Sequence, residues 1–366
     1  MLHILHGADL HLDAPFTSLP AEKARQRREE QRELIERLTG LARSRGADLL
    51  VLSGDLFDSA DTYAETTQAL CRSLGQTGCP VFIAPGNHDF YGVRSPYTAL
   101  TWPENVHIFT SPALERVDLP SLDCAVYGAA FTGPAREDCP LSGSQAEPGP
   151  KYRIGVLHGE VDGAGRYCPI PREDIAASGL SYLALGHVHA CSGLQREGET
   201  WWAYPGCPEG RGFDETGDKG CLWIELDAGG GAEAQFLPLA ARRYQVLEAD
   251  VTGRDPAEAL LSALPEGCEK DILRVVLTGE TGEEGVDLTA LAALAAPRCY
   301  HLELRDRTSI RRDLWDRAEE DTLTGLFLRS MRERLAGAGS GEEREVLELA
   351  VRFGLAALEH REEPLP

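Results

Sequence analysis

Residues 80–89, PVFIAPGNHD, combine an apolar run with a glycine-containing turn that carries an amide, an imidazole and a carboxylate. A short apolar run bounded by glycine and proline is typical of a buried strand. Similar pairs of apolar run and polar turn begin near residues 2, 48, 153 and 180. Between the early runs, residues 21–44 and 64–77 predict helices. Strands that alternate with helices favour a largely parallel α/β sheet.

The turns at the ends of these five runs carry most of the residues able to do chemistry. They are Asp9-Leu10-His11, Gly54-Asp55-Leu56-Phe57-Asp58, Gly86-Asn87-His88-Asp89, His158-Gly159-Glu160 and Gly186-His187-Val188-His189. Loops beyond the carboxyl ends of parallel strands form the ligand crevice of an open α/β sheet, so we expect these turns to meet in space. The other five histidines are expected to be ordinary core or surface residues: His3, His6, His107, His301 and His360.

Side chains from these turns form a candidate set of metal ligands. The set is Asp9, His11, Asp55, Asn87, His158, His187 and His189. The absence of thiolates disfavours structural zinc, whereas nitrogen and oxygen ligands suit Mn²⁺, Fe²⁺ or Zn²⁺ in a catalytic site. Seven ligands are too many for one tetrahedral ion, so we expect two ions about 3.5–4 Å apart that share one carboxylate. Asp55 follows a glycine at the tip of a strand and is the predicted bridge.

Composition limits the class of protein. The 366 residues are 42% hydrophobic and 26% charged, which is ordinary for a soluble globular protein of about two domains. No apolar run reaches the ~18 residues of a membrane span, and the N-terminus lacks the features of a signal peptide. The ten cysteines are spread singly without a C-x-x-C pair, which favours reduced thiols. We therefore expect a cytoplasmic protein without a membrane segment.

The net charge of −23 at pH 7 repels polyanions at long range. It therefore counts against a nucleic-acid ligand, although a metal-centred site carries its own positive charge.

The later sequence suggests a second, smaller domain. Three apolar runs without intervening helices close the first domain, at residues 201–204, 220–226 and 234–239. A β-α-β-α-β pattern follows, with runs at 246–251, 256–263, 272–278, 287–295 and 300–305. Residues 313–335 predict one long helix, and the glycine-rich segment 337–341 predicts a flexible break. In the last predicted helix, 342–360, Leu347, Ala350, Val351, Gly354, Leu355 and Leu358 lie near one face.

The five turn motifs resemble those of the calcineurin-like metallophosphoesterases over roughly residues 1–243. Within that group the chain is most similar to the SbcD/Mre-type DNA repair nucleases, including the YhaO-like branch. The closer likeness rests on Leu12-Asp13-Ala14-Pro15-Phe16, on Gly210-Arg211-Gly212-Phe213-Asp214 and on the appended second domain. The resemblance implies an α/β fold with a metallophosphoesterase β-sandwich core flanked by helices (1–243). It also implies a small α/β capping domain (244–336), then a flexible break and C-terminal helix (337–366).

The resemblance assigns roles to the candidate ligands. It implies that one ion binds Asp9, His11, Asp55 and His189, and that the other binds Asp55, Asn87, His158 and His187. The two divalent ions, expected to be Mn²⁺ with Fe²⁺ or Zn²⁺ as alternatives, would activate a hydroxide for in-line attack on phosphorus. His88 matches the histidine that donates a proton to the leaving oxygen. Asp89 is expected to orient that imidazole and raise its pKa.

The activity implied in this way is metal-dependent hydrolysis of DNA phosphodiesters in DNA repair, as a 3′→5′ exonuclease. The capping domain would guide DNA to the metals. Candidate contacts are Arg305, Arg307, Arg311 and Arg312, with Arg25, Arg27, Arg28 and Arg32 in the first domain. The alternative for each arginine is a solvated helix face paired with nearby acidic side chains.

The family likeness also implies protein partners. The C-terminal helix would dock an SbcC/Rad-type coiled-coil ATPase, or its apolar stripe would pack on its own capping domain. The chain has no G-x-x-x-x-G-K-[ST] phosphate loop, so any ATP dependence would come from a partner. The nuclease family is commonly dimeric, which makes a homodimer an expectation here.

Three other functions stay open. A protein phosphatase of the same superfamily is disfavoured, because Ser59 and Asp89 stand where those enzymes carry arginine and glutamate. A small-substrate phosphodiesterase, acting on cyclic nucleotides or nucleotides, shares the motifs and suits the acidic charge, but would not need the second domain. A scaffold without activity is disfavoured by the complete ligand set.

Overall fold

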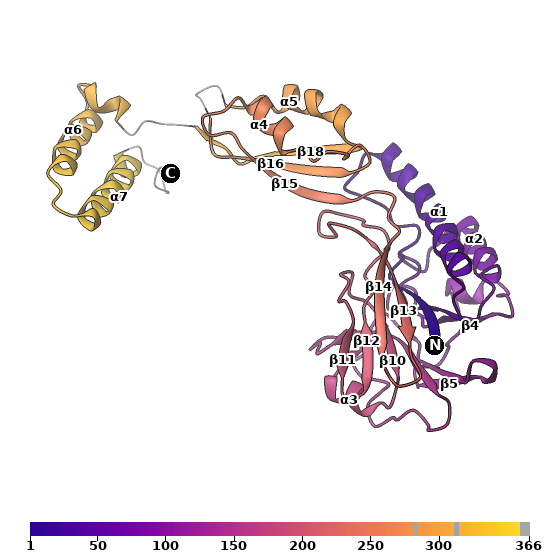
Figure 1. The fold of residues 1–366 in the computed structure, drawn as a ribbon. Coiled ribbons are helices and arrows are strands. Elements are labelled where there is room, and N and C mark those ends of the chain that lie inside the picture. The colour runs from indigo at the N-terminus through magenta and orange to yellow at the C-terminus, as the bar shows by residue number, and fades with distance from the viewer. Residues whose placement is uncertain (282–284, 311–314, 359–366) are drawn as a thin grey trace. The chain divides into compact units, whose positions relative to one another are not determined.

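The computed structural model describes residues 1–281, 285–310 and 315–358 of the chain, which divides into two compact units (Figure 1). The first unit comprises Met1–Gln245 together with Lys270–Ile272. The second comprises Val246–Glu269 and Leu273–Pro366.

The first unit is a sandwich of two six-stranded sheets. Strand order in the first sheet is β14 (Ala232–Pro238), β13 (Gly220–Leu226), β1 (Leu2–Gly7), β2 (Leu49–Leu52), β3 (Val81–Ile83), β4 (Val106–Ile108). Strand order in the second is β11 (Gln195–Glu197), β12 (Thr200–Ala203), β10 (Tyr182–Gly186), β7 (Tyr152–His158), β6 (Cys124–Gly128), β5 (Glu115–Leu119). Both sheets have a parallel centre: β1 to β4 in the first, and β6, β7, β10 and β12 in the second. The predicted parallel α/β region is therefore two sheets rather than one.

Alternating side chains explain why the two sheets pack together. Ile4 and Val51 of the first sheet face Ile154 and Tyr182 of the second in a buried core between them. Because successive strand residues point to opposite faces, the neighbours of these residues in the first sheet face outward. Those neighbours pack in a separate core beneath two helices.

Helices α1 (Ala21–Arg45) and α2 (Ala64–Gly75) cover the outer face of the first sheet (Figure 1). From α1, Leu38 is buried in that core, and from α2, Leu70 is buried beside it. α1 ends at Arg45 and is followed by Gly46, whose φ of 68° lies in the left-handed region that glycine adopts readily. On the outer face of the second sheet lies the short helix α3 (Arg172–Ala177).

The predicted strand cluster at the end of the first domain does not stay together. β12 pairs with β10 in the second sheet, whereas β13 and β14 form an antiparallel hairpin on the edge of the first. The expectation of one closing cluster was therefore wrong. β13 pairs with β1, so the hairpin extends the first sheet, whereas β12 lies between β10 and β11 in the second.

The second unit contains a three-stranded sheet in the order β15 (Tyr244–Asp250), β16 (Ile272–Thr278), β18 (His301–Asp306). α4 (Pro256–Ala263) lies between β15 and β16 in the sequence, and α5 (Leu288–Ala295) precedes β18. Each helix is preceded by an aspartate, Asp255 or Asp287, whose carboxylate accepts hydrogen bonds from backbone N–H groups of the first turn. Such caps satisfy donors that the helix itself cannot.

Two helices follow in the second unit, α6 (Leu323–Ala336) and α7 (Gly341–Leu358). The expectation of one helix over 313–335 was wrong in the described part of that range. A short 3₁₀ turn at Asp316–Glu319 comes first, and α6 then begins at Leu323, after Thr322, whose hydroxyl accepts a hydrogen bond from the backbone N–H of Gly325. The helices pack through a buried core of Leu328, Met331, Val351 and Leu355.

No helix among the described residues has the length and apolar character to cross a membrane. All ten cysteines lie in the described ranges and carry free thiols.

Candidate metal centre

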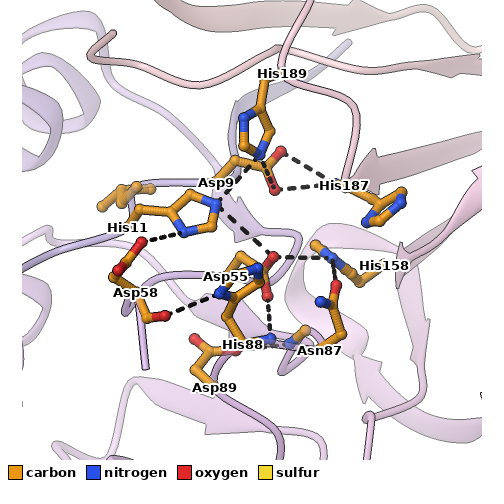
Figure 2. Close-up of polar contacts among 12 residues, drawn as sticks. Asp9, His11, Asp55, Asp58, Asn87, His88, Asp89, His158, His187 and His189 are labelled. Atoms are coloured by element: carbon orange, nitrogen blue, oxygen red, sulfur yellow. Dashed lines mark hydrogen bonds and ion pairs between the residues drawn. The ribbon is translucent and has the colours of Figure 1, made fainter. Parts of the chain in front are cut away.

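Five parallel strands end at the same edge of the sandwich, and each is followed by polar side chains of the candidate site (Figure 2). β1, β2 and β3 of the first sheet lead to Asp9, Asp55 and Asn87. β7 ends on His158, and β10 ends one residue before His187. The turns after β1 and β2 run side by side, because the Asp9 N–H donates to the Gly54 carbonyl.

One group of ligand atoms comes from Asp9, His11 and His189, which all lie within 4.8 Å of one another. Nε2 of His11 is 3.2 Å from Nε2 of His189. Nε2 of His189 is 3.8 Å from Asp9 Oδ1, and Nε2 of His11 is 3.8 Å from Asp55 Oδ2. The imidazole nitrogens and the carboxylates therefore face a common space.

A second group contains Asp9, Asp55 and His158. Asp55 Oδ2 lies 3.3 Å from Nε2 of His158, which in turn lies 3.0 Å from Oδ1 of Asn87. The His187 ring lies beside that of His158, with 5.2 Å between ring centroids. The seven predicted ligands thus gather at one place, with Asn87 and His187 beside these two groups of atoms rather than within them.

The backbone at the site is held in an uncommon conformation. Four predicted ligands have positive φ: Asp9 at 54°, His11 at 42°, Asp55 at 49° and His187 at 103°. Such angles are uncommon outside glycine and cluster at functional sites. Gly86 belongs to the same arrangement, because a Cβ there would lie 2.2 Å from Asp55 Oδ1. The glycine leaves room for the carboxylate.

Burial and charge set the protonation of these side chains. Burial lowers the pKa values of His11 and His187 to about 4, so both imidazoles are neutral near pH 7. Burial raises the pKa of Asp9 to about 6. Burial opposes the charging of His158 and Asp55 as well, but their mutual attraction prevails. It raises the pKa of His158 to about 9 and holds the pKa of Asp55 below its usual range.

His88 is exposed next to these groups. Its backbone N–H donates to Asp55 Oδ1 at 2.9 Å, and its ring lies 4.9 Å from that of His11. Nδ1 of His88 lies 2.9 Å from the carbonyl oxygen of Asp58. Since a carbonyl only accepts, Nδ1 carries hydrogen and Nε2 is the atom free to exchange a proton.

The expected role of Asp89 as the orienting partner of His88 was wrong. Among the described residues, no hydrogen bond joins the Asp89 carboxylate to the His88 ring. Instead, Asp89 accepts from the backbone N–H groups of Leu56, Phe57 and Gly86 and from the Tyr97 hydroxyl, which is 2.5 Å away. Asp89 is 1% exposed and ties the second and third turns together.

Sequence reasoning missed three polar neighbours of the site. Asp58 Oδ1 lies 3.2 Å from His11 Nδ1, but the two are not aligned as a hydrogen bond, and that nitrogen has no hydrogen-bond partner among the described residues. Glu215 Oε1 lies 2.6 Å from His189 Nδ1, and Arg211 binds both carboxylates. Asp58 and Arg211 lie in motifs already singled out, whereas nothing in the sequence marked Glu215.

The donor set fits divalent cations. It combines carboxylate oxygens and imidazole nitrogens, which suit Mn²⁺, Fe²⁺ and Zn²⁺. Asp9, His11, Asp55 and His158 are each at most 2% exposed. Buried charge of this density calls for compensating charge, which a cation between the carboxylates would supply.

The candidate DNA-contacting arginines have different surroundings. Arg27 is fully buried and bonds to Glu30 and Glu209, so the expectation that it contacts DNA was wrong. Arg25, Arg305 and Arg307 are exposed. Arg28 is half-buried and donates to the Pro15 carbonyl, and Arg32 pairs with Glu65. Arg305 bonds to Glu303. Arg311 and Arg312 lie outside the described residues.

Comparison with known proteins gives the family of these motifs. The model for calcineurin-like phosphoesterases matches residues 2–191. The chain is 32% identical over 240 residues to the uncharacterized metallophosphoesterase YhaO of Bacillus subtilis, an alignment that covers 62% of this chain and 58% of that protein. The chain thus spans less than two thirds of this relative's length.

Several relatives carry nuclease or repair names. The DNA double-strand break repair protein Mre11 of Methanopyrus kandleri is 28% identical over 340 residues, which cover 84% of this chain and 71% of that protein. The SbcD subunit of the SbcCD nuclease of Bacillus subtilis is 26% identical over 276 residues, which cover 64% of this chain and 68% of that protein.

Proposed function

Because the chain belongs to the calcineurin-like phosphoesterase family, we propose that it is a two-metal phosphodiesterase whose substrate is DNA. The observation that carries the proposal is that side chains of five separate turns gather around Asp55, whose Oδ2 lies 3.8 Å from Nε2 of His11 and 3.3 Å from Nε2 of His158. A scaffold without activity would not need four ligands in strained backbone conformations at one place.

We assign the ligands to two positions. Asp9, His11 and His189 hold one cation, Asn87, His158 and His187 hold the other, and Asp55 is shared. Mn²⁺ is the metal we expect, with Fe²⁺ and Zn²⁺ as alternatives. When bound, the pair supplies positive charge for the phosphate oxygens and lowers the pKa of the attacking water.

His88 supplies the proton for the leaving oxygen in this proposal. Its Nδ1–H donates to the Asp58 carbonyl, so in the imidazolium form Nε2–H points away from that contact and is able to donate. Exposure of His88 leaves the ring accessible to a substrate oxygen. Asp89 acts through the backbone: it fixes the turns that carry Asp55 and His88.

The choice of DNA rests on one relative named for DNA repair and one named as a nuclease subunit, and on the second unit of the chain. The most exposed candidate contacts are Arg25, Arg305 and Arg307. The net charge of −23 favours the alternative, a phosphodiesterase for cyclic nucleotides or nucleotides, because a small substrate is less repelled than a polymer.

α7 is the proposed docking element for an SbcC/Rad-type coiled-coil ATPase. Its buried residues Val351 and Leu355 pack with α6, but Val346, Leu349 and Phe353 are 63%, 54% and 55% exposed. An exposed row of large apolar side chains on one helix suits a helical partner. A homodimer stays a second expectation for this chain.

A panel of substrates with Mn²⁺ tests the proposal: linear duplex DNA, single-stranded DNA, a cyclic nucleotide and a phosphopeptide. We expect cleavage of DNA that is abolished by EDTA and by Asp55→Asn. Faster turnover of the cyclic nucleotide than of either DNA would move the assignment to the small-substrate alternative. No hydrolysis of any diester would contradict the proposed activity.

A further inference from the structure

Glu215 contacts one of the candidate metal ligands directly. It is 6% exposed, and its Oε1 lies 2.6 Å from Nδ1 of His189. Both carboxylate oxygens are also held by Arg211. The backbone N–H of Arg211 donates to Oε2 at 2.7 Å, and its Nη2 donates to Oε1 at 2.8 Å. These contacts with Arg211 fix the Glu215 carboxylate next to the His189 imidazole.

Two groups compete for Nδ1 of His189. The Glu215 carboxylate only accepts hydrogen bonds, whereas Nη2 of Arg211, 3.1 Å from the same nitrogen, only donates. The contact with Glu215 is shorter by 0.5 Å, so Nδ1 carries the hydrogen. The lone pair is then on Nε2, which faces His11 Nε2 and Asp9 Oδ1. In the opposite tautomer Nε2 would carry hydrogen and be unable to bind a cation.

The same arginine extends this support to the neighbouring turn. Nη1 of Arg211 donates to Asp58 Oδ1 at 2.9 Å, and that oxygen lies 3.2 Å from Nδ1 of His11. One guanidinium thus joins the carboxylates that lie behind both histidines of this position. Removal of Glu215 would free Arg211 to donate to His189 and so favour the wrong tautomer.

The second cation position, formed by Asn87, His158 and His187 with the shared Asp55, is supported in a different way. Nδ1 of His158 lies 2.9 Å from the backbone carbonyl of Ser53, which fixes the same kind of tautomer without any charged side chain. Ser53 is fully buried. Loss of Glu215 would leave this contact intact.

From these contacts we propose that Glu215 is a positioning residue for His189, held by Arg211, and that only the cation position formed by Asp9, His11 and His189 depends on it. This inference rests on the proposed two-metal site. A carboxylate behind a histidine ligand orients the ring and raises its basicity, and loss of such a group typically weakens metal binding about 10–100-fold.

The test is Mn²⁺ binding to the full chain, measured by calorimetry and by electron paramagnetic resonance, for wild type, Glu215→Gln and Glu199→Gln. Glu199 is the matched control, because it is 93% exposed and forms a 2.6 Å ion pair with Arg196 on the surface. We expect two ions in wild type and in the control. In Glu215→Gln one ion should bind as in wild type and the other about 10–100-fold more weakly, with loss of one histidine nitrogen coupling to Mn²⁺.

Arg211→Met is the second variant, which serves if Glu215→Gln does not fold. It keeps the Glu215 carboxylate but removes the guanidinium that holds it, so the affinity for the same ion should fall by a smaller factor than in Glu215→Gln. Unchanged binding of both ions in a folded variant, or equal weakening of both, would overturn the inference while the proposed function stands. If wild type binds none of Mn²⁺, Fe²⁺ and Zn²⁺, both the inference and the proposed function are overturned.

Discussion

Oδ2 of Asp55, just after β2, lies 3.3 Å from Nε2 of His158, the last residue of β7. One ion pair therefore joins the two sheets of the sandwich at the candidate site. Neither residue is more than 2% exposed. Because the pair is buried, the proton on His158 is held tightly, and a cation that uses Nε2 must displace it.

Mn²⁺ binding should accordingly strengthen as the pH rises. The pKa of His158 is raised to about 9, so below that value a proton competes with the cation for the ring. Affinity at this position should rise about tenfold per pH unit for the one proton displaced, and more steeply below about 6, where Asp9 also protonates. Calorimetry in two buffers of different ionisation enthalpy should show about one proton released near neutral pH. Binding without proton release would contradict the ion pair.

Asp55→Asn should remove both cations, because the amide cannot supply the shared negative charge. We expect loss of Mn²⁺ from the purified protein by elemental analysis. Asp118→Asn is the control: that aspartate is exposed on the edge strand β5 and pairs with Arg116. Full Mn²⁺ content in Asp55→Asn would show that this carboxylate is not the bridge.

His88→Ala should leave metal binding unchanged and lower kcat on an unactivated diester by about 10²–10⁴, the usual contribution of a general acid. The loss should be much smaller on a nitrophenyl diester, whose leaving group departs without a proton. Equal losses on both substrates would remove His88 from the role of proton donor. His301→Ala, in the second unit, serves as the control.

Tyr97→Phe should destabilise the fold. The lost hydroxyl donates to the buried Asp89 carboxylate at 2.5 Å, and a hydrogen bond to a charged group is worth about 1.5–3 kcal/mol. Urea denaturation measures the change. Tyr63 is 58% exposed, so Tyr63→Phe should stay within about 0.5 kcal/mol of wild type. Equal stability of the two variants would mean that Asp89 does not need this partner.

Arg27→Ala should lower stability rather than DNA affinity. It would leave Glu209 and Glu30 without their buried partner, a change that typically costs about 3–5 kcal/mol. Arg25→Ala, on an exposed position of the same helix, should leave stability unchanged. If DNA is the substrate, this variant should also reduce the slope of log affinity against log salt concentration by about one. A destabilised Arg25→Ala with a stable Arg27→Ala would reverse this assignment.

The sequence predicted the structure best where a candidate site residue directly follows a buried strand. Apolar runs ending in Asp55, Asn87 and His158 predicted buried strands, and those residues do meet, because parallel strands end at a common edge. The division into two sheets could not be predicted from apolar runs alone. The alternation of side chains explains why both faces of β1 are buried. The pairing of β1 with β2 and β13, in contrast, depends on contacts between residues far apart in the sequence.

The errors at the site have two physical origins. Asp89 is adjacent to His88 in sequence, so an interaction between them was the natural expectation, yet successive residues of a turn point in different directions. Their side chains meet different partners: Tyr97 for Asp89 and the Asp58 carbonyl for His88. Glu215 reaches His189 from a distant loop, which sequence spacing does not reveal.

The central claim is that two cations lie between these turns and share Asp55. Diffraction from a crystal soaked in Mn²⁺, recorded at the manganese absorption edge, tests it most directly. We predict two anomalous peaks about 3.5–4 Å apart, one beside Asp9, His11 and His189 and one beside Asn87, His158 and His187. A map with manganese bound elsewhere and no peak within coordination distance of Asp55 would contradict the account.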